Sequence, residues 1–234
     1  MSAPVHKLHA QPTNERNLAE LRRDVVKYAQ ELAQRGWVAN HDGNITVRLP
    51  GWKLLATPTA LSKRLLTEND LILLDRDDRV IQGGRKAFSE LKLHRAVYDA
   101  RADAFAVVHT HAPCATALAV AGIEIEPKML AEAVVSLGEE IPLLPYRFPN
   151  SAEQIAEVRH AAVTFDALTI ANHGVFAWGD DLEQAFLRAE LVEHLAAIQL
   201  RAMQVGKITT VPQADLQRLL QARTKAGLGV AGRA

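Results

Sequence analysis

Two histidines lie one residue apart at the end of an apolar run, in the stretch AVVHTHAP at residues 106–113. Alternate side chains of a strand project from the same face, so His109 and His111 are expected side by side, with Cβ atoms about 6 to 7 Å apart. Imidazole groups at that spacing can bind one metal ion. They can equally be two partly exposed histidines near a strand end, each hydrogen-bonded separately. The pair alone leaves both interpretations open.

Further ligands must come from elsewhere, because two histidines alone would hold a metal ion weakly. His173 is one candidate, since it follows the apolar run LTIA and precedes Gly174, which permits a tight turn; the alternative is a turn histidine packed on the sheet. Glu90 is another, since it opens the helix expected before the histidine strand; the alternative is a carboxylate that only stabilises the helix start. Three neutral imidazoles and one carboxylate suit Zn²⁺, with Mn²⁺, Co²⁺ or Fe²⁺ as less favoured ions.

The elements that must position these residues follow from hydrophobic periodicity and turn signals. One helix is expected over residues 15–36, where apolar side chains recur at helical spacing and Gly36 is a stop signal. Strands that meet through hairpins and are flanked by helices predict helices on both faces of a mixed, mostly antiparallel sheet. The other expected elements are hairpins over 41–59 and 70–84, a helix over 89–101 capped by Ser89, a strand over 104–111, a helix over 113–120, a strand over 140–146, a helix over 151–164 begun by Ser151, two strands over 167–179, and a helix from 180 or 181 to about 203.

The chain has 234 residues, 48% of them hydrophobic, with no internal repeat and no linker. We therefore expect one domain over residues 15–225, preceded by a flexible segment at 1–14 and followed by a flexible tail at 226–234. Basic and acidic residues number 27 each, so no long-range field favours nucleic acid or an anionic membrane surface. A single cysteine, no signal peptide and no apolar run of about 18 residues predict a soluble, cytoplasmic protein.

Five short motifs occur in an order that resembles the class II aldolase/adducin family, which includes fuculose-phosphate aldolase and ribulose-phosphate 4-epimerase. Each motif is weak alone, and their shared order over about residues 18–204 makes the resemblance specific. They are the glycine loop GNITVR at 43–48, TPT at 57–59, Ser89-Glu90 followed by His94, the pair His109 and His111, and Asn172-His173-Gly174.

The resemblance implies a three-layer α/β/α fold that assembles as a homotetramer, with the site near a subunit interface. It also implies a divalent ion, usually zinc, held by Glu90, His109, His111 and His173. In the aldolases the ion binds the ketose and stabilises the enediolate that remains when the carbon–carbon bond breaks. The glutamate of the family shuttles the proton, so Glu90 is expected to act as both ligand and general acid/base.

The anion pocket of the family is matched only in part. Asn44, Thr59 and Ser89 stand at positions that donate to the substrate phosphate, with a helix N-terminus expected at Ser89. Ala60 stands where the aldolases usually have glycine, and Phe88 stands where they have a serine. Phe88 removes one hydroxyl donor, so an unphosphorylated substrate stays open beside a sugar phosphate.

The leading function is a metal-dependent aldolase that cleaves a small ketose or ketose phosphate by a retro-aldol reaction. The tyrosine proton donor of the fuculose-phosphate enzyme has no counterpart, since no tyrosine follows Tyr146; Glu132 is either a substitute or a solvated helix charge. A sugar-phosphate 4-epimerase is the first alternative, although that enzyme carries aspartate at the position of Glu90. Dehydratases and decarboxylases of the same fold are further alternatives. A non-enzymatic adducin-like module is the last, and the retained ligand residues argue against it.

Overall fold

The computed structural model describes residues 17–229 and 232. Over these residues eight strands form one sheet in the order β4-β3-β2-β1-β5-β8-β7-β6, and all neighbours are antiparallel except β6 and β7. The strands are β1 (Asn44–Leu49), β2 (Lys53–Ala56), β3 (Ile72–Leu74), β4 (Val80–Gln82), β5 (Ala106–Thr110), β6 (Leu143–Leu144), β7 (Ala167–Ile170) and β8 (Gly174–Gly179). The α-helices are α1 (Leu18–Gln34), α2 (Leu91–Ala100), α3 (Pro113–Val120), α4 (Ala131–Leu137), α5 (Ala152–Thr164), α6 (Leu182–Val205) and α7 (Gln213–Lys225). Short 3₁₀ helices cover Pro50–Trp52, Lys63–Leu65, Glu68–Asp70 and Pro127–Met129.

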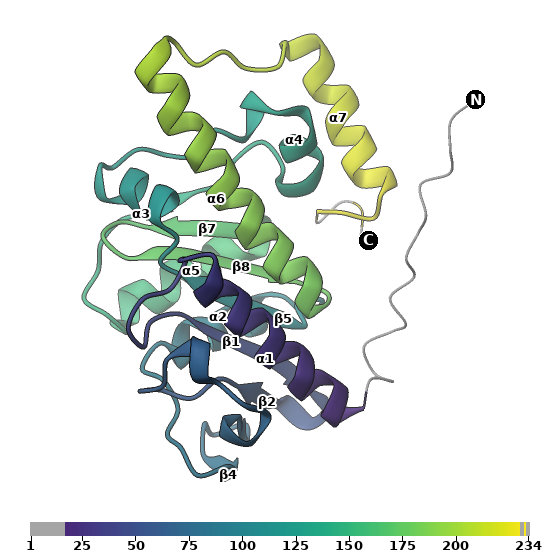
Figure 1. The fold of residues 1–234 in the computed structure, drawn as a ribbon. Helices are drawn as coiled ribbons and strands as arrows, with labels where there is room; N and C mark the ends of the chain where they lie inside the picture. Colours follow the sequence, from purple (N-terminus) through teal and green to yellow (C-terminus); the bar gives the residue numbers. More distant parts are fainter. Residues whose placement is uncertain (1–16, 230–231, 233–234) are drawn as a thin grey trace.

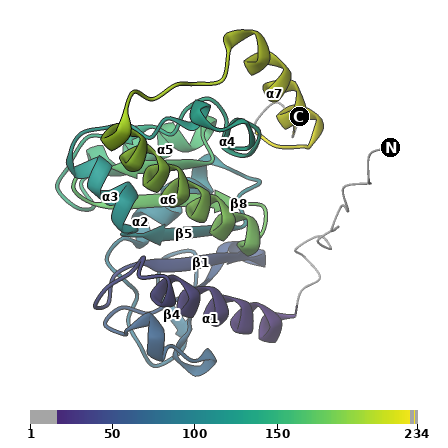
Figure 2. The ribbon, with the colours of Figure 1, turned by 45° about the horizontal axis from the view of Figure 1, so that its top comes forward.

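Helices cover both faces of the sheet (Figure 1 and Figure 2). Helices α1, α3 and α6 pack on one face, and α2 and α5 pack on the other. Successive side chains of β5 alternate between them: Ala106 and Val108 belong to the first core and Val107 to the second. The predicted three-layer α/β/α sandwich with a mixed, mostly antiparallel sheet is confirmed. His109 lies on the same face of β5 as Val107, next to the last residue of the strand.

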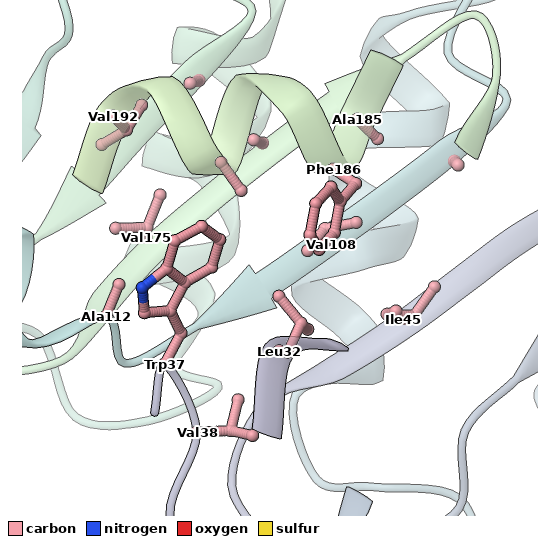
Figure 3. Packing of buried hydrophobic residues seen from close by; sticks show 14 of the residues in the cluster. Leu32, Trp37, Val38, Ile45, Val108, Ala112, Val175, Ala185, Phe186 and Val192 are labelled. Carbon is pink, nitrogen blue, oxygen red and sulfur yellow. The ribbon is translucent and has the colours of Figure 1, made fainter. Parts of the chain in front are cut away.

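The core under α1 and α6 fixes the loop that follows α1 (Figure 3). Trp37 and Phe186 meet there, with ring centroids 6.0 Å apart, close to Leu32 and Val108. Burying each large apolar side chain contributes roughly 1.5 to 3 kcal/mol. The anchored loop then meets the end of β5, where the amide of His111 donates to the backbone oxygen of Trp37 at 3.0 Å. The core therefore positions one of the candidate ligands directly.

Three helices begin where the sequence places a capping residue. Asn17 and Glu20 form a capping box at the start of α1. Ser151 accepts from an amide in the first turn of α5, and Asp181 does the same for α6. These residues satisfy amide groups that a helix start leaves without partners. The starts of α5 and α6 are as predicted, whereas α1 begins three residues after the predicted start at residue 15.

The predicted cap of α2 is wrong. The helix begins at Leu91, Glu90 occupies the N-cap position, and no side chain caps the helix. Ser89 lies one residue earlier in a turn and is exposed. A serine caps a helix only from the residue directly before it, and the turn at 89–90 gives that place to Glu90. The helix N-terminus is therefore offset from Ser89.

Helix α7 was not predicted from the sequence. Only Leu216 and Arg223 of this helix are buried, so no apolar stripe marks it. Arg223 instead pairs with the buried carboxylate of Asp166. Arg101 and Arg188 also pair with Asp166, at 3.0 and 3.1 Å. Buried charges are tolerated when they are paired, and here a carboxylate just before β7 links α7 to α6 and to the end of α2.

The predicted flexible ends remain predictions. Residues 1–14 lie outside the described residues, and of 226–234 the structure describes 226–229 and 232. In that part the amide of Gly227 donates to Thr224 O at 2.9 Å and the amide of Leu228 to Arg223 O at 3.0 Å, which continues α7 into a turn. Among the described helices, none is long and apolar enough to cross a bilayer.

Candidate metal centre

Four side chains from three parts of the chain meet at one end of β5 and β8. His109 lies in β5 and His111 one residue beyond it, His173 lies in the turn between β7 and β8, and Glu90 directly precedes α2. One ligand atom of each lies within 4.8 Å of the others. We call Glu90, His109, His111 and His173 the Glu–His cluster. The structure thus brings together the four residues that the sequence suggested as ligands.

The ring of His109 is fully buried and is fixed on two sides. Its Nδ1 lies 2.8 Å from Val175 O. Because a carbonyl oxygen only accepts, Nδ1 carries the proton and Nε2 keeps its lone pair in the neutral ring. The ring also stacks on Phe176, with centroids 4.0 Å apart and 17° between the planes. This leaves Nε2 facing His111 Nε2 at 3.1 Å and Glu90 Oε2 at 3.4 Å.

His111 is oriented by a residue that the sequence analysis did not single out. Its Nδ1 lies 3.5 Å from Asp42 Oδ2. A carboxylate behind the ring favours the Nδ1–H form and turns Nε2 toward the cluster. Burial, with smaller effects of His109 and His173, lowers the pKa of His111 to about 4, although Asp42 opposes the shift. His111 is therefore neutral at pH 7, as a metal ligand must be.

Glu90 is a carboxylate at neutral pH. Burial opposes its charge, but His109 and His173 hold the pKa of its carboxyl group well below its usual range. Its Oε1 is hydrogen-bonded to His173 Nε2, and its Oε2 accepts from Asn44 Nδ2 at 2.8 Å. One oxygen of Glu90 is therefore held by Asn44 while the other meets a histidine.

The donor set fits a divalent cation. The Nε2 atoms of His109 and His111 face one another at 3.1 Å, beside the carboxylate of Glu90. Lone pairs at that distance repel unless a proton or a cation lies between them. Imidazole nitrogens together with one carboxylate oxygen are typical ligands of Zn²⁺, and they also serve Mn²⁺, Co²⁺ and Fe²⁺. The Glu–His cluster therefore has the donor atoms to hold a divalent metal ion.

Two glycines let backbone segments approach the cluster closely. Gly43 has φ +68°, and a Cβ there would lie 2.3 Å from Val38 Cγ1. At Gly174 a Cβ would lie 2.3 Å from Thr110 O and 2.9 Å from His111 Cδ2. Real Cβ atoms do not tolerate such contacts, so both motif glycines have a steric cause.

Gly174→Ala is expected to lower the free energy of unfolding by about 1 to 3 kcal/mol and to displace His111, because the new methyl group overlaps a backbone oxygen. Gly84→Ala is the matched control, since nothing lies within 4 Å of a Cβ at that position. The control should change the free energy by less than about 0.5 kcal/mol. Urea unfolding measures both variants, and equal midpoints would contradict the steric argument.

A buried lysine supports the loop that carries Asp42. Lys63 is 2% exposed, and its Nζ donates to His41 O at 2.9 Å. Burial lowers the pKa of Lys63 to about 8, while the carboxylates of Asp42 and Glu90 oppose the shift. Lys63 thus holds the backbone directly before Asp42 by a hydrogen bond. No motif in the sequence indicated this role.

Asp42→Asn is expected to weaken zinc binding about 10-fold, because it removes the charge behind His111 and keeps the side-chain size. This is the smaller end of the 10- to 100-fold range expected for a residue that orients a metal ligand, because Asp42 is 43% exposed and solvent screens its charge. Asp77→Asn is the control, because Asp77 pairs with Arg79 at an exposed turn. Zinc competition with a chelator measures the affinities; unchanged binding in Asp42→Asn would remove Asp42 from the site.

A chain of buried hydrogen bonds leads away from Glu90. Asn44 Oδ1 lies 2.5 Å from His94 Nε2, and His94 Nδ1 lies 2.8 Å from Thr46 Oγ1. Thr46 Oγ1 in turn lies 2.8 Å from the hydroxyl of Tyr98. None of these four side chains is more than 3% exposed. Strand β1 supplies Asn44 and Thr46 and helix α2 supplies the other two, so the chain lies between sheet and helix.

His94 should make the fold sensitive to acid. Burial lowers its pKa from 6.5 to about 3. Below pH 6.5 His94 becomes protonated in the unfolded chain but stays neutral in the folded chain. The free energy of unfolding therefore falls as the pH decreases toward 3. Between pH 7 and pH 5 the loss from this group is about 2 kcal/mol. Urea unfolding at pH 7 and at pH 5 measures this loss. The free energy of unfolding should change less between the two pH values for His94→Gln than for the wild type, and equal changes would refute this account.

The three residues expected at the substrate anion lie at different depths. Asn44 is buried, and its amide serves Glu90. Thr59 is half-buried, and its backbone amide donates to Lys86 O at 3.1 Å, which brings the TPT segment beside the residues before Glu90. Ser89 is exposed next to Glu90. Binding of an anion by these residues stays a prediction.

The two departures from the family pattern have clear local effects. Ala60 adopts φ 55°, the left-handed conformation that glycine reaches without strain, and this costs roughly 1 to 2 kcal/mol for a residue with a Cβ. Phe88 is 7% exposed and packs edge-on against His94, with ring centroids 5.1 Å apart. Its ring therefore belongs to the core under α2, and it offers no donor to a substrate.

The chain matches a family model and several known enzymes over most of its length. Residues 23–200 match the Class II Aldolase and Adducin N-terminal domain. The chain is 32% identical over 204 residues to the 5-methylthioribulose-1-phosphate/5-deoxyribulose-1-phosphate aldolase of Rhodospirillum rubrum, covering 86% of this chain and 90% of that one. It is 30% identical over 198 residues to the methylthioribulose-1-phosphate dehydratase of Gluconobacter oxydans, covering 78% of this chain and 92% of that one. The L-fuculose-1-phosphate aldolase of Thermus thermophilus has a similar crystal structure, with a TM-score of 0.71, 27% identity, and coverage of 82% and 99%.

The family match agrees with the geometry of the site. The matched residues contain the whole Glu–His cluster and the glycine loop that lies against it. The fold also agrees, because the structure of the Thermus enzyme matches 82% of this chain. This chain therefore belongs to the class II aldolase and adducin family.

Proposed function

We propose that this chain is a divalent-metal-dependent lyase that cleaves a carbon–carbon bond in a small ketose phosphate by a retro-aldol reaction, with zinc as the first candidate ion. The observation that carries the proposal is the convergence of the Glu–His cluster, whose ligand atoms lie within 4.8 Å of one another. The Rhodospirillum relative supports it, because its name is that of an aldolase for two ketose 1-phosphates.

The roles of the residues follow from their contacts. The Glu–His cluster would hold the ion, with Val175 O orienting the ring of His109 and Asp42 orienting that of His111. A bound divalent cation would supply Lewis-acid stabilisation of negative charge on substrate oxygens. Glu90 is the one carboxylate of the cluster, so it is the group that would accept a proton and return it.

The retro-aldol reaction moves one proton twice. A base takes the hydroxyl proton of the carbon that leaves as an aldehyde, the carbon–carbon bond breaks, and a proton returns to the carbon of the remaining ketone. We assign both transfers to Glu90, the half-buried carboxylate of the cluster, which takes up the hydroxyl proton and then delivers it to the carbon. We assign the substrate anion to Thr59, Ser89 and the one amide hydrogen of Asn44 that Glu90 does not use.

A dehydratase is the second candidate. The Gluconobacter relative favours it, because its name is that of a dehydratase for a ketose 1-phosphate and its identity to this chain is close to that of the Rhodospirillum aldolase. Both reactions develop negative charge on the oxygen of the ketone carbon. The same cluster therefore serves either reaction, and only the products separate them.

Product analysis tests the proposal. Zinc-loaded protein is incubated with ketose 1-phosphates, pentulose 5-phosphates and unphosphorylated ketoses, and the products are identified by mass spectrometry. An aldolase releases an aldehyde and dihydroxyacetone phosphate from a ketose 1-phosphate, whereas a dehydratase releases water and keeps the carbon chain whole. An epimerase leaves the mass unchanged, and a decarboxylase requires a keto acid and releases carbon dioxide. Protein that binds well under one zinc ion per chain and turns over none of these substrates would favour a non-enzymatic module.

We further propose that the chain assembles as a homotetramer in the cytoplasm, with a small carbohydrate or sugar phosphate as its partner and without nucleic acid or membrane partners. Phe148 and Val205 support an assembly, since they are 77% and 88% exposed and apolar side chains so exposed are often covered by another subunit. Sedimentation equilibrium should give a mass about four times that of one chain. A monomer at micromolar concentration would refute the tetramer.

A further inference from the structure

The hydrogen bonds behind Glu90 can run in only one direction. The carboxylate only accepts, so Asn44 must turn its amide nitrogen toward Glu90 Oε2, at 2.8 Å. This turns Asn44 Oδ1 toward His94 Nε2, at 2.5 Å, and an amide oxygen also only accepts. His94 Nε2 must therefore carry the proton. The lone pair of Nδ1 then accepts from the hydroxyl of Thr46, at 2.8 Å.

The opposite direction leaves two acceptors in contact. If the amide of Asn44 were flipped, its Oδ1 would meet the ionised Glu90 Oε2 at about the same 2.8 Å. Asn44 is 3% exposed and the side chain of Glu90 is 18% exposed, so little water can relieve a contact between two acceptors there. The ring of His94 cannot turn away to another partner, because it lies edge-on to Phe88 and Phe176, with centroids 5.1 and 5.7 Å away. The orientation of the chain is thus imposed by packing and by the charge of Glu90 together.

We propose that His94, in the neutral form that carries its proton on Nε2, is a positioning residue that fixes the amide of Asn44 and through it the orientation of Glu90. Both ring nitrogens of His94 are engaged by Asn44 and Thr46, so the ring acts on Glu90 only through Asn44. The inference rests on the proposed role of Glu90 as a ligand. It gives Asn44 a second task beside the substrate anion, which is to hold one carboxylate oxygen.

The tautomer of His94 gives the first test. Two-dimensional ¹H–¹⁵N NMR of the ¹⁵N-labelled wild type at pH 7, without metal and without substrate, distinguishes a protonated Nε2 from a protonated Nδ1. The expected result is a neutral ring with the proton on Nε2. A proton on Nδ1 would require a flipped Asn44 and would overturn the inference. This measurement needs no variant, so it decides the question even where a substitution prevents folding.

Zinc affinity gives the second test. His94→Phe keeps a ring in the core and removes the donor to Asn44, and it should weaken zinc binding by about 10- to 100-fold. His94→Gln should retain binding close to that of the wild type, because the side-chain amide nitrogen of glutamine can reach the position of Nε2. Gln199→Met is the control. Gln199 is 2% exposed, donates to Glu124 O and accepts from the amide of Glu126, so its replacement removes two hydrogen bonds of a buried side chain away from the site.

The pattern of affinities separates positioning from general loosening of the core. Weak binding in His94→Phe, with near-normal binding in His94→Gln and Gln199→Met, supports the inference. Unchanged binding in His94→Phe, or equal weakening in Gln199→Met, overturns it. Neither test uses a substrate, so a chain without lyase activity would leave the inference standing. A failed inference would likewise leave the lyase proposal intact, because Glu90 can bind a metal ion without help from His94.

Discussion

His111→Ala is expected to remove bound metal and turnover together. The side chain supplies one of the four donor atoms, and its Nε2 lies 3.1 Å from that of His109. The zinc affinity should fall by more than the roughly 100-fold effect of removing a residue that only orients a ligand, because the donor atom itself is removed. The fold should survive, since His111 is 29% exposed and water can fill the space that the ring leaves.

The measurement pairs metal content with turnover in the same sample. Zinc per chain is determined after dialysis, and the rate is measured on the substrate that the product analysis identifies. His160→Ala is the matched control, because His160 is exposed on α5. Addition of imidazole to His111→Ala should restore part of both quantities. An undiminished rate in the variant would refute the ligand role of His111.

The elements that position the site were predictable where local signals and burial agree. The helix predicted over 15–36 is found at Leu18–Gln34, with a capping box at its start and Gly36 just after its end. The helix over 113–120 is found at Pro113–Val120, since proline fits the first turn of a helix. Helix α7 was missed because it is held by an ion pair between Arg223 and Asp166, and a pairing across 57 residues leaves no periodic trace in the sequence.

The ligands were predictable for a different reason. Two histidines one residue apart on a strand share a face by local geometry alone, and a glycine beside His173 signals a close approach, which Gly174 makes to Thr110 O. The outer partners carry no such local signal. Asp42 reaches His111 only because the loop before β1 lies against the end of β5, and Asn44 lies opposite His109 only through the strand register. Register follows from the whole sheet, so these partners could not be read from neighbouring residues.

Glu90→Gln is expected to slow proton transfer by about 10² to 10⁴-fold while retaining metal better than His111→Ala does. The substitution keeps the length and shape of the side chain. Its carbonyl oxygen can still accept from Asn44, and its amide can donate to His173, so the two contacts of Glu90 have counterparts. What is lost is the negative charge and the ability to take up and return a proton.

Exchange of carbon-bound hydrogen separates that loss from a loss of metal. Dihydroxyacetone phosphate is incubated in D₂O with zinc-loaded protein, and uptake of deuterium is followed by NMR, which reports proton transfer without carbon–carbon cleavage. Slow deuterium exchange by the Glu90→Gln variant, at a normal zinc content, would assign the proton transfer to Glu90. Glu124→Gln is the control, because Glu124 is exposed on a loop and should exchange at the wild-type rate. If Glu90→Gln kept both wild-type exchange and turnover, Glu90 would be a ligand only. The proton would then have to come from another group, and since the histidines of the cluster would serve as metal ligands, that group would lie outside the cluster.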